Sequence, residues 1–523
     1  MLPSSRQTSP VHLRDWKLIT LPVLSGFLAY ASFPAISQGY LAWVAYVPLA
    51  IFVGRLSTFR SAFLGGLLVG IIQFSLLLCW IPGVLVQYGN ISTVLAWLLY
   101  GLMILILGTY PAIAAGTTGY AMQRRGPSCL LLLPFAWVSV ELLRSYTPFG
   151  GFPWLLTGYS QTDYLPVVQI ADITGVYGLS LLILIANVGI AWRILKGPAA
   201  RTRLWPALAA CGLILLCLAY GHVSLRKWSP GPTLRKTAIL QANIPLEGPD
   251  REVEWKFQEG YLRMADALRG KTIDLLVLPE SPAPKSFEQD KAYQEAMRSL
   301  AKRYPMGLIL SNVATGRDEG ASEYFNSAYF LDSDGNLSGR YDKVRLVPFG
   351  EYVPFKRAFF FLDSITREVS DFSAGSEFLR VRVGGHQTSA IICYEAVFPS
   401  LARRFVSGGS ELLVNLTNDA WYGNTPAPYQ HLAMARWRAV ENRRWLIRAA
   451  NSGISAVIDP GGRIRSATGL FREEACTGPF DFVSELTIYS RYGDVCACLC
   501  VIISCVVLLG VRRAGAGRER QQI

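Results

Sequence analysis

Asp274-Leu-Leu-Val-Leu-Pro-Glu280 is a short aliphatic run that stops at a proline and a carboxylate. A continuous apolar run of this length, bounded by a turn signal, is typical of a buried β-strand. The stretch Ser389-Ala-Ile-Ile-Cys393-Tyr-Glu395 repeats the pattern and ends near a thiol. Because ligands of α/β sheets gather at the carboxyl ends of strands, the two stretches predict an α/β domain with its site at Glu280 and Cys393.

Strand-like runs alternate with polar, helix-like stretches between residues 234 and 480. This alternation indicates a layered α/β domain, and two sheets with helices outside are the natural packing for so many strands. We therefore expect an αββα sandwich. The expected strands are 237–241, 275–278, 307–311, 327–331, 389–393, 412–416, 447–450 and 455–458. The expected helices are 253–269, 289–304, 399–407 and 429–442.

The whole chain is more apolar than a soluble domain. It has 523 residues, of which 51% are hydrophobic and 17% charged, with a net charge of +13, whereas globular domains are about 25% charged. Most of the excess positive charge lies in residues 1–221 and 495–523, and residues 222–494 are nearly neutral. A nucleic-acid binder concentrates its basic charge on a folded domain, so this distribution argues against nucleic acid as a partner and indicates a membrane protein.

Eight apolar runs suit a hydrocarbon core of ~30 Å. They lie near 18–33, 41–54, 61–80, 91–120, 128–143, 174–192, 204–221 and 495–511. No small-residue cleavage site follows the first run closely, so we interpret it as a retained helix. We predict a membrane domain at 1–221, a catalytic domain at 222–494, and an eighth helix with its tail at 495–523.

The charges between the runs alternate by side. Fifteen Lys and Arg residues fall on one side of the membrane, against Arg144 alone on the other. The positive-inside rule then predicts that both termini are cytoplasmic and that residues 222–494 lie outside the cytoplasm. Glu141 is nearly the only acidic residue inside the runs, and we interpret it as a pair with Arg144 near a helix end, not as part of a transport path.

A third segment adds a cation to the predicted site. Residues 339–354 place Lys343 and Glu351 in a loop punctuated by Pro and Gly. A thiol with a pKa of ~8.5 is a poor nucleophile near neutral pH. Glu280 could take its proton, and Lys343 could hold the oxyanion formed when Cys393 attacks an acyl carbonyl. Each residue also has an ordinary structural interpretation, as a packed thiol, a helix-start charge or a solvated lysine.

Longer segments resemble known families. Residues 278–281, 341–343 and 393–395 resemble the Glu–Lys–Cys signature of the nitrilase, or carbon–nitrogen hydrolase, superfamily. The segments similar to the apolipoprotein N-acyltransferase family are 346–354, 415–423, 430–442 and 448–456, with 151–161 in the membrane part. The resemblance covers nearly the whole chain and implies a nitrilase-like αββα domain on a membrane domain of about eight helices.

The resemblance implies a bacterial inner-membrane enzyme with a periplasmic catalytic domain and no cofactor or metal. Cys393 would be the nucleophile, Glu280 the proton acceptor and Lys343 the oxyanion partner. An acyl chain would pass from a phospholipid such as phosphatidylethanolamine to Cys393 as a thioester. It would then pass to the α-amine of the diacylglyceryl-cysteine of an apolipoprotein. The alternative is a membrane-tethered nitrilase or amidase that uses the same residues with water as the acceptor.

The resemblance further implies supporting roles for Glu351, Tyr394 and Glu395, and a part in substrate handling for Trp421. One departure concerns a Lys-Trp pair that the family usually carries after the 241–244 segment. The nearest tryptophan here is Trp255, and whether it fills the same role stays open.

A contiguous aromatic run, Phe359, Phe360 and Phe361, follows Lys356 and Arg357. Neither helix nor strand geometry turns contiguous side chains to one interior face, and aromatic residues favour the membrane interface. We therefore expect a membrane-touching arm that helps to bind substrate. The alternative is that these rings pack inside the domain.

Overall fold

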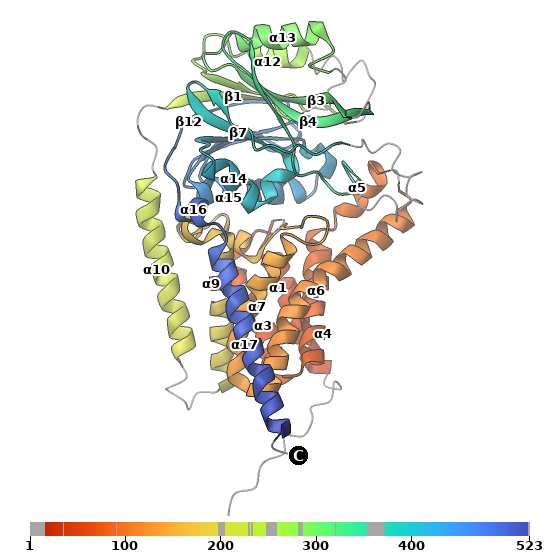
Figure 1. Cartoon of the computed structure of the whole chain (residues 1–523), viewed down its shortest axis with the longest axis vertical. Helices are drawn as coiled ribbons and strands as arrows, with labels where there is room; N and C mark the ends of the chain where they lie inside the picture. Colours follow the sequence, from red (N-terminus) through yellow and green to blue (C-terminus); the bar gives the residue numbers. More distant parts are fainter. Residues whose placement is uncertain are drawn as a thin grey trace, which may run out of the picture.

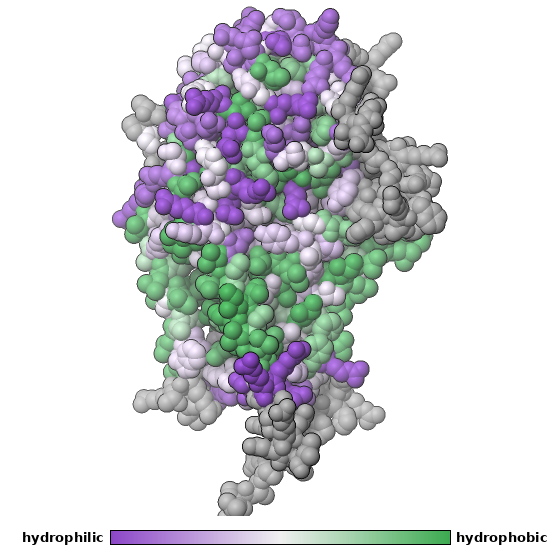
Figure 2. Space-filling view, viewed as in Figure 1, coloured by the Kyte–Doolittle hydropathy of each residue, from purple (hydrophilic) through white to green (hydrophobic). Residues whose placement is uncertain are grey.

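The computed structural model stacks a two-sheet domain on a helical membrane part (Figure 1). It describes residues 16–34, 36–89, 91–196, 204–228, 231, 234–246, 259–280, 286–318, 321–352 and 372–520. Hydrophobic residues form a band around the helices, whereas the visible face of the two-sheet domain and the opposite end of the helices are hydrophilic (Figure 2). The band marks where the helices meet the bilayer.

The membrane part consists of apolar helices with recognisable end signals. Thr58 caps α4 by accepting a hydrogen bond from the Ser61 backbone N–H, and α6 ends at Gly126, whose φ is 95°. The helices are α1 (Trp16–Ala31), α2 (Ala42–Ala45), α3 (Val47–Arg55), α4 (Phe59–Leu77), α5 (Ile81–Gln87), α6 (Thr93–Arg125), α7 (Leu133–Arg144), α8 (Leu165–Val168), α9 (Ala171–Lys196), α10 (Trp205–Lys227) and α17 (Val495–Arg520).

Among the described residues, six helical segments are long and apolar enough to cross a membrane. Two shorter apolar helices, Leu18–Ala31 and Gly39–Arg55, occupy the first two expected runs. The expectation of about eight helices therefore corresponds to six full spans and two short ones. α10 continues to Lys227, beyond the expected end of its run at residue 221.

The two-sheet domain has the expected αββα layers (Figure 1). The first sheet has the order β12-β1-β2-β3-β4-β5 and the second β11-β10-β9-β8-β7-β6. The first sheet comprises β1 (Arg235–Gln241), β2 (Leu275–Val277), β3 (Leu308–Asp318), β4 (Ala321–Leu331), β5 (Leu337–Asp342) and β12 (Glu474–Phe480). The second comprises β6 (Val381–Val383), β7 (His386–Ile392), β8 (Leu412–Thr417), β9 (Trp445–Ala450), β10 (Ala456–Ile458) and β11 (Ile464–Ala467).

Helices cover both outer faces. They are α12 (Tyr261–Asp266), α13 (Lys291–Ala301), α14 (Pro399–Ser407), α15 (Ala427–Asn442) and α16 (Ile488–Tyr492). α12 and α13 lie beyond the first sheet, and α14 and α15 lie between the second sheet and the membrane part (Figure 1). α14 has the expected bounds, and α13 starts later than expected because Asp290 caps it by accepting from the Tyr293 N–H. Residues 253–258 of the expected first helix lie outside the described residues.

The strands β1 and β2 of the first sheet are buried on both faces. On β2, Leu275 and Val277 join the core between the sheets, whereas Leu276 packs toward α12 and α13. Alternate side chains of a strand point to opposite faces, so a strand covered on both sides is apolar throughout. This is why residues 274–280 form a continuous aliphatic run and not an alternating one.

One buried cluster continues from the membrane helices through α15 into the space between the sheets. Polar contacts join the same surfaces. The Arg443 guanidinium donates to Asp172 Oδ2 at 2.7 Å and to Gln169 Oε1 at 2.6 Å, and Trp437 Nε1 donates to Thr162 Oγ1 at 2.9 Å. The two parts are therefore held in a fixed relation.

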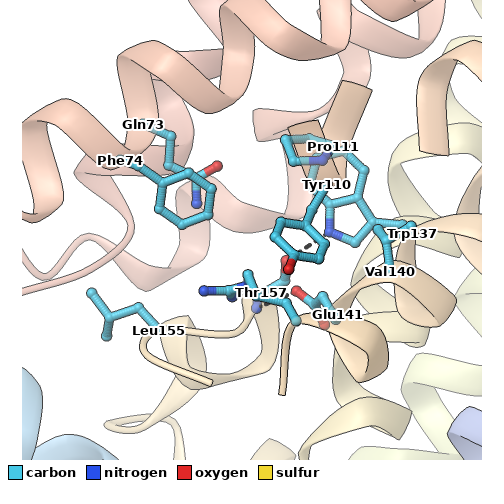
Figure 3. Close-up of a pocket in the computed structure, with 10 residues that line it drawn as sticks. Gln73, Phe74, Tyr110, Pro111, Trp137, Val140, Glu141, Leu155 and Thr157 are labelled. Atoms are coloured by element: carbon cyan, nitrogen blue, oxygen red, sulfur yellow. Dashed lines mark hydrogen bonds between the residues drawn. The ribbon is translucent and has the colours of Figure 1, made fainter. Parts of the chain in front are cut away.

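Glu141 and Arg144 are buried and hold a returning chain segment, residues 151–161, against the helices. The Glu141 carboxylate accepts from the Thr157 backbone N–H at 2.7 Å, and Arg144 Nη1 donates to the carbonyls of Phe152 and Trp154 at 3.1 and 2.9 Å. Glu141 and Thr157 line a small pocket with residues of α4, α6 and α7 (Figure 3). The expectation of an interfacial pair is wrong, because both charges serve backbone groups of the returning segment.

Candidate active site

Three strand ends bring the predicted trio together. Glu280 follows β2, Lys343 follows β5, and Cys393 follows β7. The first two come from one sheet and the thiol from the other, so the site lies where the carboxyl ends of both sheets meet. Lys343 and Cys393 are 1% and 7% exposed.

Glu280 is held by two donors and faces the thiol. Its Oε1 accepts from Asn326 Nδ2 at 2.7 Å and its Oε2 accepts from the Asn418 backbone N–H at 2.9 Å. The charge of this carboxylate raises the pKa of the Cys393 thiol. Burial raises the pKa of Glu280 above its usual 4.5, although Lys343 opposes the rise. A carboxylate with a raised pKa is a stronger base and suits proton abstraction from a thiol.

Lys343 is a buried cation with two carboxylate neighbours. Its Nζ lies 2.7 Å from Glu351 Oε1 and 3.9 Å from Glu280 Oε1. Burial alone would lower the pKa of Lys343, but the two carboxylates outweigh it and raise the pKa. The ammonium is therefore a fixed positive charge in a site of low dielectric, which is the property that oxyanion stabilisation needs.

Glu351 organises the loop that carries Lys343. Its Oε2 accepts from the Val347 backbone N–H at 2.8 Å, and its Oε1 accepts from Asn326 Nδ2 at 3.1 Å as well as from Lys343. Asn326 thus bridges Glu280 and Glu351 with one amide group. Glu351, for which the resemblance implies a supporting role, is thus in direct contact with Lys343.

Cys393 has a backbone conformation that is rare for a residue with a side chain. Its φ is 49°, in the left-handed region. A sharp turn of this kind between a strand and a helical turn lifts a nucleophile out of the sheet. Burial and Glu280 raise the pKa of the Cys393 thiol, while Lys343 lowers it in part. The resting side chain is therefore a thiol that needs a base.

Tyr394 and Glu395 are buried beside the nucleophile and have structural partners. Glu395 Oε1 accepts from Tyr341 Oη at 2.8 Å and from the Val344 N–H at 2.8 Å, and its Oε2 accepts from the Ile392 N–H at 2.7 Å. These bonds tie the turn at Cys393 to the chain next to Lys343. Burial raises the pKa of Glu395, and backbone donors oppose the rise.

Tyr394 connects the site to the membrane part, since its hydroxyl donates to the Gly151 carbonyl at 3.3 Å. Trp421 is 42% exposed and packs edge-on against Tyr88, with ring centroids 4.9 Å apart. Tyr88 directly follows α5 at the outer end of the membrane helices. Trp255 and the aromatic run 359–361 lie outside the described residues.

Several site residues were not predicted as such. Asn326 lies on β4 with nothing in its neighbouring sequence to mark it, and the Asn418 contact is made by the backbone. His431 Nε2 lies 3.1 Å from the Cys393 carbonyl, and its position in the sequence does not mark it as part of the site. Among the described residues, no group of three or more His, Cys, Asp or Glu is placed to hold a metal ion.

An αββα sandwich with a cysteine, a glutamate and a lysine at its strand ends defines the carbon–nitrogen hydrolase class, and residues 236–485 match the carbon-nitrogen hydrolase family. Residues 25–189 match the apolipoprotein N-acyltransferase N-terminal domain. The chain belongs to the apolipoprotein N-acyltransferase family, and it is a membrane-bound acyltransferase.

Two apolipoprotein N-acyltransferases support this assignment over nearly the full length. The apolipoprotein N-acyltransferase of Geobacter metallireducens is 39% identical over 501 residues, which cover 93% of this chain and 94% of the relative. That of Chlorobaculum tepidum is 30% identical over 524 residues, covering 94% and 95%. A solved amidase from Nesterenkonia sp. is 21% identical, with a TM-score of 0.38 over 51% of this chain and 96% of the amidase.

Proposed function

We propose that this protein moves an acyl chain from a phospholipid to Cys393 as a thioester, and then to the α-amine of a diacylglyceryl-cysteine at an apolipoprotein N-terminus. The observation that carries the proposal is the convergence of Glu280, Lys343 and Cys393 where the carboxyl ends of the two sheets meet, next to the membrane part. Glu280 is the proton acceptor, Lys343 the oxyanion partner and Cys393 the nucleophile.

In the first half-reaction, Glu280 takes the thiol proton as Sγ attacks the ester carbonyl of the phospholipid. Negative charge develops on the carbonyl oxygen, and the Lys343 ammonium stabilises it. The tetrahedral intermediate collapses by breaking the bond to the glycerol oxygen, which takes the proton from Glu280. The products are acyl-Cys393 and a lysophospholipid.

In the second half-reaction, the neutral α-amine of the acceptor attacks the thioester carbonyl. Glu280 takes a proton from the nitrogen, and Lys343 again faces the oxyanion. The carbon–sulfur bond breaks, and the proton on Glu280 returns to the Cys393 sulfur. One amide bond has formed, one thioester has been consumed, and the enzyme is regenerated.

The proposed acceptor is an amine and not water, and the burial of the site supports this choice. Lys343 and Cys393 are almost fully buried, and a site that excludes water protects a reactive thioester from hydrolysis. A tethered hydrolase would need water beside Cys393. The burial therefore favours transfer over the amidase-type alternative.

The site residues near the membrane suit lipid substrates. Tyr394 reaches the returning segment and Trp421 packs on Tyr88. We propose that Trp421 contacts a lipid chain as it enters. The charge bias of the loops supports a catalytic domain, residues 222–494, on the periplasmic side, with the 1–221 and 495–523 parts in the inner membrane and both termini in the cytoplasm.

The experiment supplies purified protein in phosphatidylethanolamine vesicles with a synthetic diacylglyceryl-cysteine peptide. The expected product is the N-acyl peptide, with one lysophospholipid formed per amide. The matched control is the same peptide with its α-amine acetylated, which should give neither product in quantity. Free fatty acid released equally fast from both peptides would favour the hydrolase and contradict the proposal.

A further inference from the structure

The backbone at Cys393 needs an external restraint. A positive φ of 49° is unfavourable for any residue with a Cβ, and such a conformation persists only where its surroundings impose it. Glu395 restrains one side of this turn by accepting from the Ile392 N–H at 2.7 Å. The carbonyl of Cys393 itself is held from the other side, by a residue of α15.

That residue is His431, which is fully buried. Its Nε2 lies 3.1 Å from the Cys393 carbonyl oxygen. A carbonyl oxygen only accepts hydrogen bonds, so the contact requires the proton to be on Nε2. This holds for the neutral Nε2–H tautomer and for the imidazolium alike.

The other ring nitrogen is fixed by a buried ion pair. His431 Nδ1 lies 2.9 Å from Asp419 Oδ1 and 3.2 Å from Arg448 Nη2, and Arg448 Nη2 donates to Asp419 Oδ2 at 2.6 Å. Because the Asp419 carboxylate only accepts, its contact is a hydrogen bond from Nδ1–H, and together with the Cys393 contact it places a proton on each ring nitrogen. Burial and then Arg448 lower the pKa of His431, and the hydrogen bonds to Asp419 and to the Cys393 carbonyl oppose this. The ion pair therefore orients the ring with its donor toward Cys393.

The membrane part contacts one face of the His431 ring. Trp154 of the returning segment stacks on His431, with ring centroids 5.8 Å apart and planes at 29°. Trp154 Nε1 donates to Gln430 Oε1 at 2.9 Å, and Gln430 Nε2 donates to the carbonyls of Pro34 and Leu77 at 2.9 and 3.1 Å. Two adjacent residues of α15 thus join the ends of membrane helices to the catalytic turn.

We propose that His431 is a positioning residue whose Nε2–H holds the Cys393 carbonyl, so that the thiol stays directed at Glu280 and Lys343, with Trp154 fixing the ring from the membrane side. The inference rests on the proposed role of Cys393 as the nucleophile. It differs from simple core packing because it depends on one donor atom and not on the volume of the ring.

Two variants of the full-length protein separate these roles. His431→Phe keeps an aromatic ring against Trp154 but removes the donor. His431→Gln loses the ring but can offer an amide N–H near the position of Nε2. The measurement is the single-turnover rate of acyl-thioester formation on Cys393 in phosphatidylethanolamine vesicles, as a function of donor concentration.

We expect His431→Phe to lower the maximal acylation rate by about 10²-fold, as small misplacements of reacting groups do, with an unchanged half-saturating donor concentration. His431→Gln should recover most of the rate. An unimpaired His431→Phe enzyme would overturn the proposal. The proposal would also be overturned if the His431→Gln enzyme acylated Cys393 as slowly as His431→Phe does, although both variants unfolded at the same temperature as each other.

A second measurement does not depend on activity or on variants that fold. The chain has 4 histidines, so ¹⁵N labelling of histidine gives a simple spectrum. We expect one ring to show a protonated Nε2 whose hydrogen exchanges slowly with solvent, and an unprotonated Nε2 at His431 would overturn the proposal. If the wild type formed no thioester, the proposed function would fail, and this spectrum would still decide whether His431 holds the carbonyl.

Discussion

Lys343 Nζ lies 2.7 Å from Glu351 Oε1, whereas its distance to Glu280 Oε1 is 3.9 Å. The ammonium is therefore bonded to the supporting carboxylate and not to the base. A close ion pair with Lys343 would lower the pKa of Glu280 and make it a weaker base. Glu351 keeps the cation near the reacting carbonyl while leaving Glu280 free to take a proton.

Glu351→Gln tests this division of roles. Without the Glu351 charge, Lys343 pairs with Glu280 alone, and the pKa of Glu280 falls. General-base catalysis contributes about 10²–10⁴-fold, so we expect a loss of about 10–100-fold in thioester formation. The control is Glu295→Gln on the exposed face of α13. A Glu351→Gln enzyme that acylates Cys393 as fast as this control would refute the account of Glu351.

The pH dependence of acylation reports the base. Glu280 must be deprotonated to act, and burial raises its pKa above 4.5. The rate of first-turnover acylation should therefore fall on acidification, with the half-maximal rate at a pH above 4.5. At that pH most exposed glutamates are still ionised. Glu280→Gln should lower the rate by about 10²–10⁴-fold and abolish this limb of the profile. A wild-type midpoint at or below 4.5 would contradict the assignment.

The buried pair Asp419–Arg448 should matter for stability. Burial alone would raise the pKa of Asp419, but Arg448 and His431 outweigh it and lower the pKa from 3.8 to about 2. The ionised form therefore stabilises the fold above pH ~4, and this contribution is lost as the pH falls through about 2. Asp419→Asn leaves Arg448 buried without its partner, which should lower the free energy of unfolding by about 3–5 kcal/mol.

Asp163→Asn is the matched control for that substitution. Asp163 also pairs with an arginine, Arg436, at 2.6 Å, but its side chain is 67% exposed. An exposed pair contributes about 0–1 kcal/mol, so this variant should unfold almost as the wild type does. Equal effects of the two substitutions in denaturant titrations would show that burial of the Asp419 pair has no energetic consequence.

The orientation in the membrane can be read from reporter fusions. α10 extends to Lys227, so a reporter after residue 231 leaves the helix intact. We expect it to report the periplasm, and a reporter after residue 520 to report the cytoplasm, because 15 of the 16 Lys and Arg residues in residues 1–221 and 495–523 fall in the two termini and alternate loops. The reverse result for both fusions would overturn the proposed location.

Strands such as β2, β8 and β9 could be predicted from sequence because they are buried on both faces and therefore form continuous apolar runs. The partly exposed strands β5, β6, β11 and β12 were not predicted. Glu280 and Cys393 could be predicted because they follow continuous apolar runs, whereas Lys343 was predicted from a loop segment that resembles the Glu–Lys–Cys signature. Asn326 could not, since its contact with Glu280 depends on how β4 pairs with its neighbours and not on local pattern. His431 was also missed, because α15 brings it to Cys393 across 38 residues of chain.

In the membrane part, too, the sequence predicts the helices but not their long-range contacts. Hydropathy identifies the spans, yet it gives no sign that Gly175 kinks α9, where a Cβ would lie 2.6 Å from the Tyr489 ring. The roles of Glu141 and Arg144 also depend on the path of the returning segment. Long-range backbone partners of this kind leave no periodic signal in the sequence.

The central claim is a thioester on Cys393, and peptide mass spectrometry of the full-length protein tests it directly. After incubation with phosphatidylethanolamine vesicles, we expect one acyl group on the peptide that contains Cys393. It should be removable by neutral hydroxylamine and absent from Cys393→Ala. Adding a diacylglyceryl-cysteine peptide should discharge it to the N-acyl product. An unmodified Cys393 in protein that is turning over, or an acyl group that the acceptor peptide cannot remove, would contradict the account.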